Sequence, residues 1–369
     1  MFTYAVYNFI IFGATLSAYL YEKSKSRNSQ IVFLVNSFLI PFVFLALRYD
    51  VGNDYHNYVE YFYKIARGDL VLKEPGYILV NYTIAYLGVS VQWLFVFFGF
   101  FTMLFVYMAL PRDGFAMGVF LFIVIFYFLW AFTSLRETLA MSIMFYASKY
   151  IYQKRFLPYL LWFFAAMMFH LMISLLLLLI YPIANKSTNR YFLIALILIS
   201  FAVVQFTDIA HSIIVTVISL FPKYTWYLNS EYMLPAKTSA GLLGPLIKIF
   251  IGLIVIFFKD KIIQKYPQAN IAINLYVLAL LGSILLLDIS IFSRLEAAYM
   301  LFFILAIIYF IKTFDRRSRI IALVLIGLFY YMMLMRYVDM ATADVDNGLY
   351  LRPYRTVLDT QTTEPVFLK

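Results

Sequence analysis

The chain has 369 residues, of which 64% are hydrophobic and 13% are charged. A soluble domain has about 45–50% apolar and about 25% charged residues, so a soluble enzyme and a disordered chain are both excluded. The formal net charge of +10 fits basic loops that orient a membrane protein, and we expect no nucleic-acid partner. The composition therefore predicts an all-α polytopic membrane protein.

Apolar runs bounded by charged residues predict about twelve transmembrane helices in one integral membrane domain, 1–369. Some runs are shorter than the roughly 20 residues that a free-standing span needs, and those within 157–183 fit either two short spans or one re-entrant hairpin. In chain order the predicted spans are 2–21, 31–47, 91–110, 115–132, 137–152, 157–169, 171–183, 191–207, 242–258, 269–288, 295–311 and 320–337.

Short basic loops alternate along the chain and predict its orientation. By the positive-inside rule, the segments richest in Lys and Arg face the cytoplasm, which places both termini outside. Three longer segments are then external: a loop at 48–90, a loop at 208–241 and a C-terminal tail at 338–369. Within the first loop, 76–88 is predicted to be a short helix at the membrane interface.

Four arginines lie at the outer ends of predicted spans, against this charge bias: Arg48, Arg136, Arg294 and Arg336. Arg136 and Arg294 are each 18 residues from a basic residue beyond the cytoplasmic end. At ~1.5 Å per residue this is roughly 27 Å, in a hydrocarbon core about 30 Å thick. By the same count His170 lies roughly 22 Å from the cytoplasmic side. These side chains therefore share one level in the outer leaflet.

A single arginine at that depth is explained by snorkelling to the outer phosphates. Several arginines at one depth, together with a histidine, indicate a site instead. Arginine binds phosphate oxygens with a bidentate fork and stays charged when partly desolvated. The pattern predicts an outer-leaflet site for a diphosphate carried on a lipid.

Other polar residues allow both a structural and a chemical interpretation. Asp54, near Arg48, either orders its loop by a salt bridge or deprotonates a sugar hydroxyl. His170 is either a core histidine bonded to a carbonyl or a proton acceptor at the membrane boundary. Glu74 either only shapes a turn before a proline or takes part in the chemistry in the same way, and Glu137 either pairs with Arg136 or caps the following helix.

Lys248 lies near the middle of the membrane by the same count, so it either pairs with Asp288 or Glu296 or lines an aqueous cavity. The chain has no cysteine and three histidines. We find no metal-ligand spacing and no glycine-rich phosphate loop, and therefore expect neither a metal nor another cofactor. Tyrosines of the first external loop, including Tyr58 and Tyr77, are candidates for stacking on sugar rings.

A succession of short motifs resembles the EpsG family of exopolysaccharide and O-antigen polymerases, often labelled Wzy-type. The resemblance covers most of the chain and is densest from 48 to 175. The motifs are R-Y-D-x-G-x-D-Y-x-x-Y (Arg48 to Tyr58), E-P-G-Y (Glu74 to Tyr77), S-x-R-E-x-L-A (Ser134 to Ala140), F-H (Phe169, His170), S-R (Ser293, Arg294) and P-Y (Pro353, Tyr354).

This resemblance implies a metal-independent GT-C-type glycosyltransferase of the bacterial inner membrane, with its active site facing the periplasm. Undecaprenyl-diphosphate-linked oligosaccharides would be both donor and acceptor, with membrane lipids and a chain-length regulator as further partners. Arg136 and Arg294 would hold the donor diphosphate, with Arg48 as a third contact. His170 or Asp54 would deprotonate the acceptor. Further residues expected to contact substrate are Tyr58, Glu74, Tyr77, Glu137, Lys248 and Arg336.

Three other functions share parts of this pattern. A ligase would use the same lipid donor and differ only in its acceptor. A flippase would place charges at the midplane between repeated halves, and only Lys248 fits that arrangement. An acyltransferase would need a polar path inward from His170, which the segment FFAAMM does not offer.

Overall fold

The structure is a computed structural model that describes residues 2–220, 222–230, 233–234, 243–340 and 350–359. Within these residues it is helical and contains no strand, although an isolated antiparallel bridge joins Arg48 to Thr356. The all-α class predicted from the sequence is therefore confirmed for the part of the chain that the structure describes.

The chain divides into two compact units. The first unit comprises Met1–Ala147, Leu161–Ser174 and Leu334–Lys369, and the second comprises Ser148–Leu160 and Leu175–Met333. That the whole chain forms one integral domain stays a prediction.

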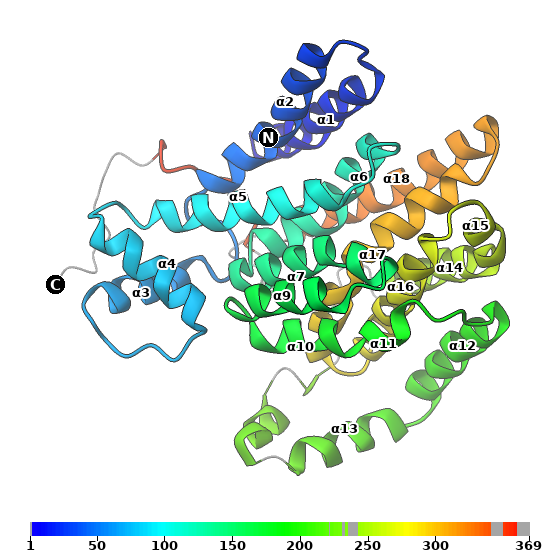
Figure 1. Ribbon diagram of the computed structural model, residues 1–369. Helices are drawn as coiled ribbons and strands as arrows, with labels where there is room; N and C mark the ends of the chain where they lie inside the picture. Colours follow the sequence, from blue (N-terminus) through cyan, green and yellow to red (C-terminus); the bar gives the residue numbers. More distant parts are fainter. Residues whose placement is uncertain (1, 221, 231–232, 235–242, 341–349, 360–369) are drawn as a thin grey trace. The chain divides into compact units, whose positions relative to one another are not determined.

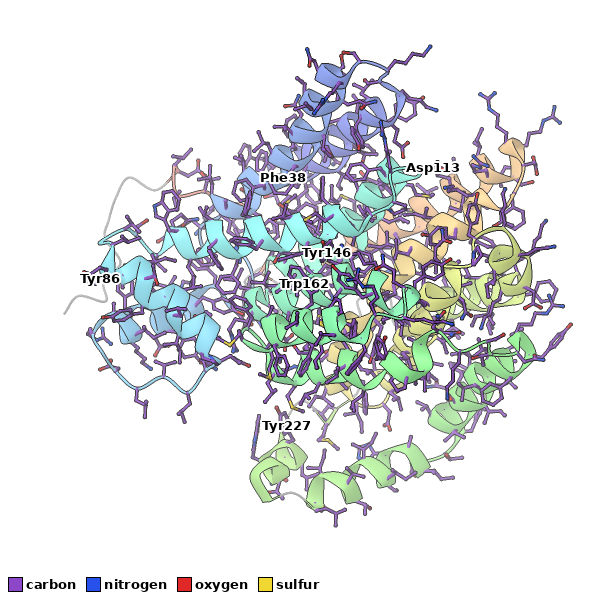
Figure 2. The ribbon with its side chains drawn as sticks, viewed as in Figure 1. Phe38, Tyr86, Asp113, Tyr146, Trp162 and Tyr227 are labelled. Carbon is purple, nitrogen blue, oxygen red and sulfur yellow. The ribbon has the colours of Figure 1, made fainter. Side chains whose placement is uncertain are left out.

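In the first unit, α1 packs along α2, and α5 packs against both α2 and α7 (Figure 1). Aromatic side chains fill the contacts: the rings of Tyr146 and Trp162 lie 5.2 Å apart, edge to face (Figure 2). The helices from the first part of the chain are α1 (Phe2–Lys23), α2 (Arg27–Ala46), α3 (Tyr55–Ala66), α4 (Pro75–Tyr86), α5 (Gln92–Ala109), α6 (Phe115–Phe122), the π-helix η1 (Ile123–Ala131) and α7 (Leu135–Ala147).

In the second unit, α16 and α17 make the most extensive helix contact, and α17 is largely buried. Gly282 of α16 permits this approach, since a Cβ there would lie 2.6 Å from the backbone N of Glu296. The helices are α8 (Lys149–Tyr152), α11 (Tyr181–Ala184), α12 (Arg190–Phe206), α13 (Ile209–Ser219), η2 (Pro222–Asn229), α14 (Leu243–Phe257), α15 (Lys259–Lys265), α16 (Ala269–Leu285), η4 (Ser290–Phe292) and α17 (Ser293–Lys312).

Three helices run from one unit into the other: α9 (Phe156–Met167), α10 (Leu171–Leu179) and α18 (Arg316–Met340). Among the described residues, five helices are long and apolar enough to cross a membrane, or six if the bent pair α12 and α13 counts as one span. These helices identify a polytopic membrane protein. The predicted count of twelve is not confirmed, because the remaining apolar helices have 10–17 residues, at or below the lower end of the length that a crossing needs.

Candidate functional site

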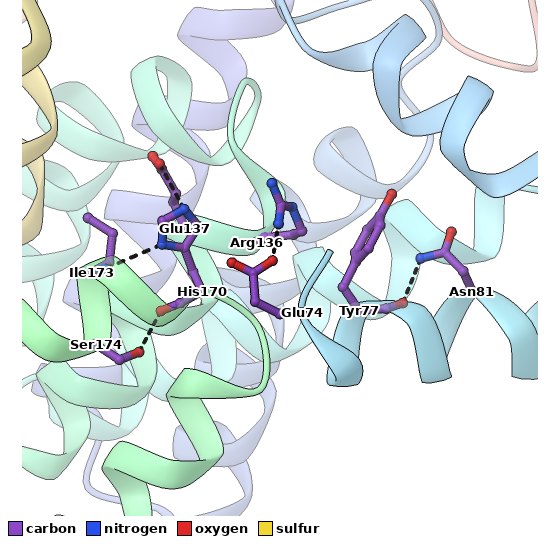
Figure 3. Close-up of polar contacts among 8 residues, drawn as sticks. All are labelled: Glu74, Tyr77, Asn81, Arg136, Glu137, His170, Ile173 and Ser174. Carbon is purple, nitrogen blue, oxygen red and sulfur yellow. Dashed lines mark hydrogen bonds and ion pairs between the residues drawn. The ribbon is translucent and has the colours of Figure 1, made fainter. Parts of the chain in front are cut away.

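Arg136 lies in the first turn of α7 and forms an ion pair with Glu74, the residue directly before α4 (Figure 3). The side chains are mostly buried, with 16% and 19% of their surfaces exposed. Pro75 occupies the first position of α4, where its fixed φ suits a helix, so Glu74 sits at the start of that helix. The pair joins the motif E-P-G-Y to the motif S-x-R-E.

A second pair lies on the same turn of α7. Nε2 of His170 is 3.2 Å from Oε1 of Glu137, and each side chain is only 10% exposed. Nδ1 of His170 accepts a hydrogen bond from the backbone N–H of Ile173 at 3.3 Å, in the first turn of α10 (Figure 3). Glu137 was expected to pair with Arg136 or to cap a helix. The ion pairs of the structure join Arg136 to Glu74 and Glu137 to His170, while Glu137 also lies in the first turn of α7, where a carboxylate suits the helix start.

Gly76 brings these two pairs together. Its N–H donates to the carbonyl O of Met168 at 2.8 Å, so α4 touches the turn that carries Phe169 and His170. A Cβ at Gly76 would lie 2.7 Å from that carbonyl, which only glycine avoids. The close approach explains why glycine follows proline in E-P-G-Y.

Two tyrosines complete the surroundings of Arg136. The ring of Tyr77 lies 5.3 Å from Cζ of Arg136, and Tyr58 interacts with the same guanidinium. Burial raises the pKa of both hydroxyls, so Tyr58 and Tyr77 are neutral at physiological pH. They face the arginine as neutral polar groups and do not cancel its charge.

Arg48 has a packing role. It is fully buried, its guanidinium lies about 5 Å from the ring centroids of Phe95 and Phe132, and one N–H group donates to the carbonyl O of Ala131 at 2.9 Å. Ala131 ends η1, where carbonyls lack partners within the helix. Burial lowers the pKa of Arg48 to about 10, so the residue stays charged at neutral pH. Its expected contact with a diphosphate stays a prediction.

The rest of the R-Y-D-x-G motif is fixed from two sides. Gly52 has a φ of 97°, and a Cβ there would lie 1.8 Å from the carbonyl O of Phe132, so the motif packs directly against the turn before α7. On its other side the backbone N–H of Tyr49 donates to the carbonyl O of Arg355 at 2.9 Å. The backbone N–H of Val357 donates to the carbonyl O of Leu47 at 3.0 Å. A segment from the far end of the chain therefore holds the motif in place.

These contacts bring the motifs of the first unit into one cluster. A partly accessible guanidinium with one carboxylate partner retains donors that can bind phosphate oxygens. A buried carboxylate held by a histidine can accept a proton. The cluster thus combines an anion-binding group with an acid–base pair.

The family model of the EpsG family matches residues 31–356. The chain belongs to the EpsG family. This family is associated with Wzy-type polymerases, so the protein is a polysaccharide-polymerase-like membrane protein at the level of the family, and the resemblance inferred from its motifs is confirmed. No curated protein and no solved structure matches the chain.

Some expected site residues of this EpsG-family chain lie in the second unit. Arg294 is in the first turn of α17 and is partly buried. Nζ of Lys248 lies 2.8 Å from Oε1 of Glu296, which confirms one of the two partners predicted for this lysine. The other candidate partner, Asp288, pairs with His211: its Oδ1 lies 3.3 Å from Nδ1 of that histidine.

The remaining expected residues belong to the first unit. Asp54 directly precedes α3 and is partly buried, while Arg336 is exposed on α18. His56 pairs with Asp50 at 2.6 Å on the surface. The expected meeting of Arg136 with Arg294 stays a prediction, since the two belong to different units.

Proposed function

We propose that this protein is a GT-C-type glycosyltransferase that joins undecaprenyl-diphosphate-linked oligosaccharide units into O-antigen, capsular polysaccharide or exopolysaccharide. It acts at the periplasmic face of the bacterial inner membrane and needs no metal ion or other cofactor. Family membership supports the reaction class. The observation that carries the proposal is the convergence of the EpsG-type motifs of the first unit on Arg136.

In this proposal Arg136 and Arg294 bind the diphosphate of the donor lipid. The bond between the anomeric carbon and the phosphate oxygen breaks, and negative charge develops on the departing diphosphate. Positioned guanidinium groups stabilise that charge in the transition state. Arg48, which is fully buried, supports the turn before Arg136.

The remaining parts of the proposal concern the acceptor and the partners. The non-reducing sugar of the next lipid-linked unit supplies the attacking hydroxyl, and Tyr58 and Tyr77 line its approach to Arg136. The lipid tails stay in the membrane. A separate chain-length regulator limits the product.

The first test is the surface glycan of a strain that lacks this gene, separated on a gel. A product of one repeat supports the polymerase. The absence of any surface repeat would indicate a flippase, and accumulation of free lipid-linked polymer would indicate a ligase; either outcome overturns the proposal.

Complementation of that strain tests the diphosphate site. Arg136→Ala removes a positioned donor, and such a loss costs about 10²–10³ in rate, so we expect single repeats in place of long chains. Arg136→Lys should also perform poorly, because lysine lacks the fork. The control is Arg67→Lys, which alters an exposed pair with Asp69 and should keep long chains. Long chains from Arg136→Ala, at equal protein level, would contradict the assignment.

Metal independence has a direct test with purified full-length protein and lipid-linked units. The polymerisation rate should be the same with and without EDTA, because arginine charges replace a metal in this proposal. A strict requirement for a divalent cation would overturn that part of the proposal.

A further inference from the structure

The contacts of His170 determine which of its ring nitrogens carries hydrogen. A neutral imidazole has one N–H and one lone pair. Nδ1 faces the N–H of Ile173, which can only donate, so Nδ1 is the acceptor and Nε2 carries the hydrogen. That Nε2–H then donates to Oε1 of Glu137 at 3.2 Å. Both nitrogens of His170 are therefore engaged by the protein.

This arrangement places the proton-accepting capacity on the carboxylate. To act as a base, neutral His170 would have to accept a proton at Nδ1, which faces the first turn of α10. A carboxylate has lone pairs for several hydrogen bonds, so the Nε2–H bond does not use up the acceptor capacity of Glu137. We propose that Glu137 is the catalytic base and that His170 is a positioning residue that orients it.

The position of Glu137 supports this role, which rests on the proposed function. It follows Arg136 directly, so both residues lie in the first turn of α7, which carries the group proposed to bind the leaving diphosphate. Glu74 supplies the carboxylate that pairs with Arg136. The first turn of a helix also favours a carboxylate electrostatically. Tyr58 on α3 also interacts electrostatically with Glu137, and burial keeps its hydroxyl neutral.

The step balances as follows. The acceptor hydroxyl oxygen forms a bond to the anomeric carbon of the donor sugar. The bond from that carbon to the phosphate oxygen breaks, and its electron pair leaves with the lipid diphosphate. The hydroxyl proton passes to the carboxylate of Glu137 and later to water.

Two amide substitutions of His170 separate its two contacts. In His170→Gln the amide N–H takes the place of Nε2–H, so the donor to Glu137 is kept and the contact with Ile173 is lost. In His170→Asn the amide oxygen takes the place of Nδ1, so the contact with Ile173 is kept and the donor is lost. Glu137→Gln removes the proposed base. Glu60→Gln, in an exposed pair with Lys64, is the matched control.

The experiment uses purified full-length protein and lipid-linked repeat units extracted from the deletion strain. We expect His170→Gln to keep at least about a third of the wild-type rate, while His170→Asn and Glu137→Gln each lose at least about 100-fold, within the range of a lost general base. In His170→Asn the pH–rate profile of the residual activity should shift, so that the loss of rate on acidification begins at a higher pH. The reason is that a carboxylate without its hydrogen-bond donor is protonated more readily. A purely structural contact would not shift that profile.

Three outcomes would overturn the inference. Equal loss in His170→Gln and His170→Asn, with both proteins folded by thermal melting, would make His170 the base. Full activity in Glu137→Gln would remove the carboxylate from the chemistry, and loss confined to Asp54→Asn would move the base to Asp54. Failure of the wild-type protein to extend any lipid-linked unit would instead refute the proposed function.

Discussion

The two units each contain a histidine paired with a carboxylate, and the two pairs differ in their surroundings. His170 and Glu137 lie 3.2 Å apart in the first unit, and His211 and Asp288 lie 3.3 Å apart in the second. The side chains of the first pair are 10% exposed, whereas those of His211 and Asp288 are 39% and 26% exposed. In addition, every residue of α13, which carries His211, is at least partly exposed.

The comparison shows that distance alone does not identify a site. An exposed ion pair contributes about 0–1 kcal/mol, because water screens it and both side chains lose rotamer freedom. The pair in the first unit is fixed by the N–H of Ile173 on one side and by the helix position of Glu137 on the other. We therefore expect loss of the contact between His170 and Glu137 to abolish activity, and loss of the contact between His211 and Asp288 to have little effect.

The largest effect on polymer formation is expected from Gly76→Ala, which would disturb the contact between α4 and the turn that carries His170. The new Cβ would lie 2.7 Å from the carbonyl O and 2.8 Å from Cβ of Met168, both close to the backbone. Either α4 or the turn bearing His170 must then shift, which changes the contact between Gly76 and Met168 that holds them together. Overpacking of this kind costs about 1–3 kcal/mol, and we expect polymer formation to be lost. Surface glycan and thermal unfolding measure the two effects.

Gly88→Ala is the matched control. Gly88 has a φ of 67° with nothing within 4 Å of the added Cβ, so only the backbone cost of about 1–2 kcal/mol applies. Polymer formation should persist. If Gly76→Ala retained activity at the level of Gly88→Ala, the contact between α4 and the His170 turn would not be needed for function.

The next prediction concerns the free energy of unfolding rather than polymer formation, and it addresses the buried pair of the second unit. Lys248→Met leaves Glu296, whose side chain is 9% exposed, without this partner, and breaking a buried pair costs about 3–5 kcal/mol. The double change Lys248→Met with Glu296→Leu should recover most of that loss, because apolar residues of similar volume often replace such a pair without cost. The free energy of unfolding in detergent is the measurement.

The corresponding double change in the first unit sharpens the comparison. Arg136→Met with Glu74→Leu should also retain a folded protein, but it should produce no polymer. Recovery of long chains in that variant would mean that the first pair, like Lys248 and Glu296, serves only to stabilise the fold.

Sequence patterns predicted the positions of the helices well, because backbone groups in lipid must be paired within each helix and the apolar runs mark where that is required. The short helix expected at 76–88 is present as α4, and its place at the membrane interface stays a prediction. The number of crossings stays a prediction, because run length does not distinguish a span from a short helix packed inside the protein. The break between η1 and α7 was predicted, since the predicted spans 115–132 and 137–152 lie on either side of it. The change from α6 to η1 has no signal, because it falls inside the uninterrupted apolar run 115–132.

The residues of this cluster were expected from the sequence, but the ion pairs between them were not. Glu74, Arg136, Glu137 and His170 were all expected near the substrate, and the motifs explain why. The partner of each residue depends on how α4, α7 and the turn before α10 pack, and neighbouring positions in the sequence favoured Arg136 with Glu137 instead. The glycines of the motifs were the available signal, since Gly52 and Gly76 mark close backbone contacts.

The smallest effect is expected from His211→Gln, which tests the partly exposed pair of His211 and Asp288 in the second unit. The pair with Asp288 is partly exposed, so its loss should change the free energy of unfolding by no more than about 1 kcal/mol. Polymer length should match the wild type, while His170→Asn abolishes extension under the same conditions. A loss of polymer in His211→Gln comparable to that in His170→Asn would show that exposure does not separate the two pairs, and it would extend the acid–base chemistry to the second unit.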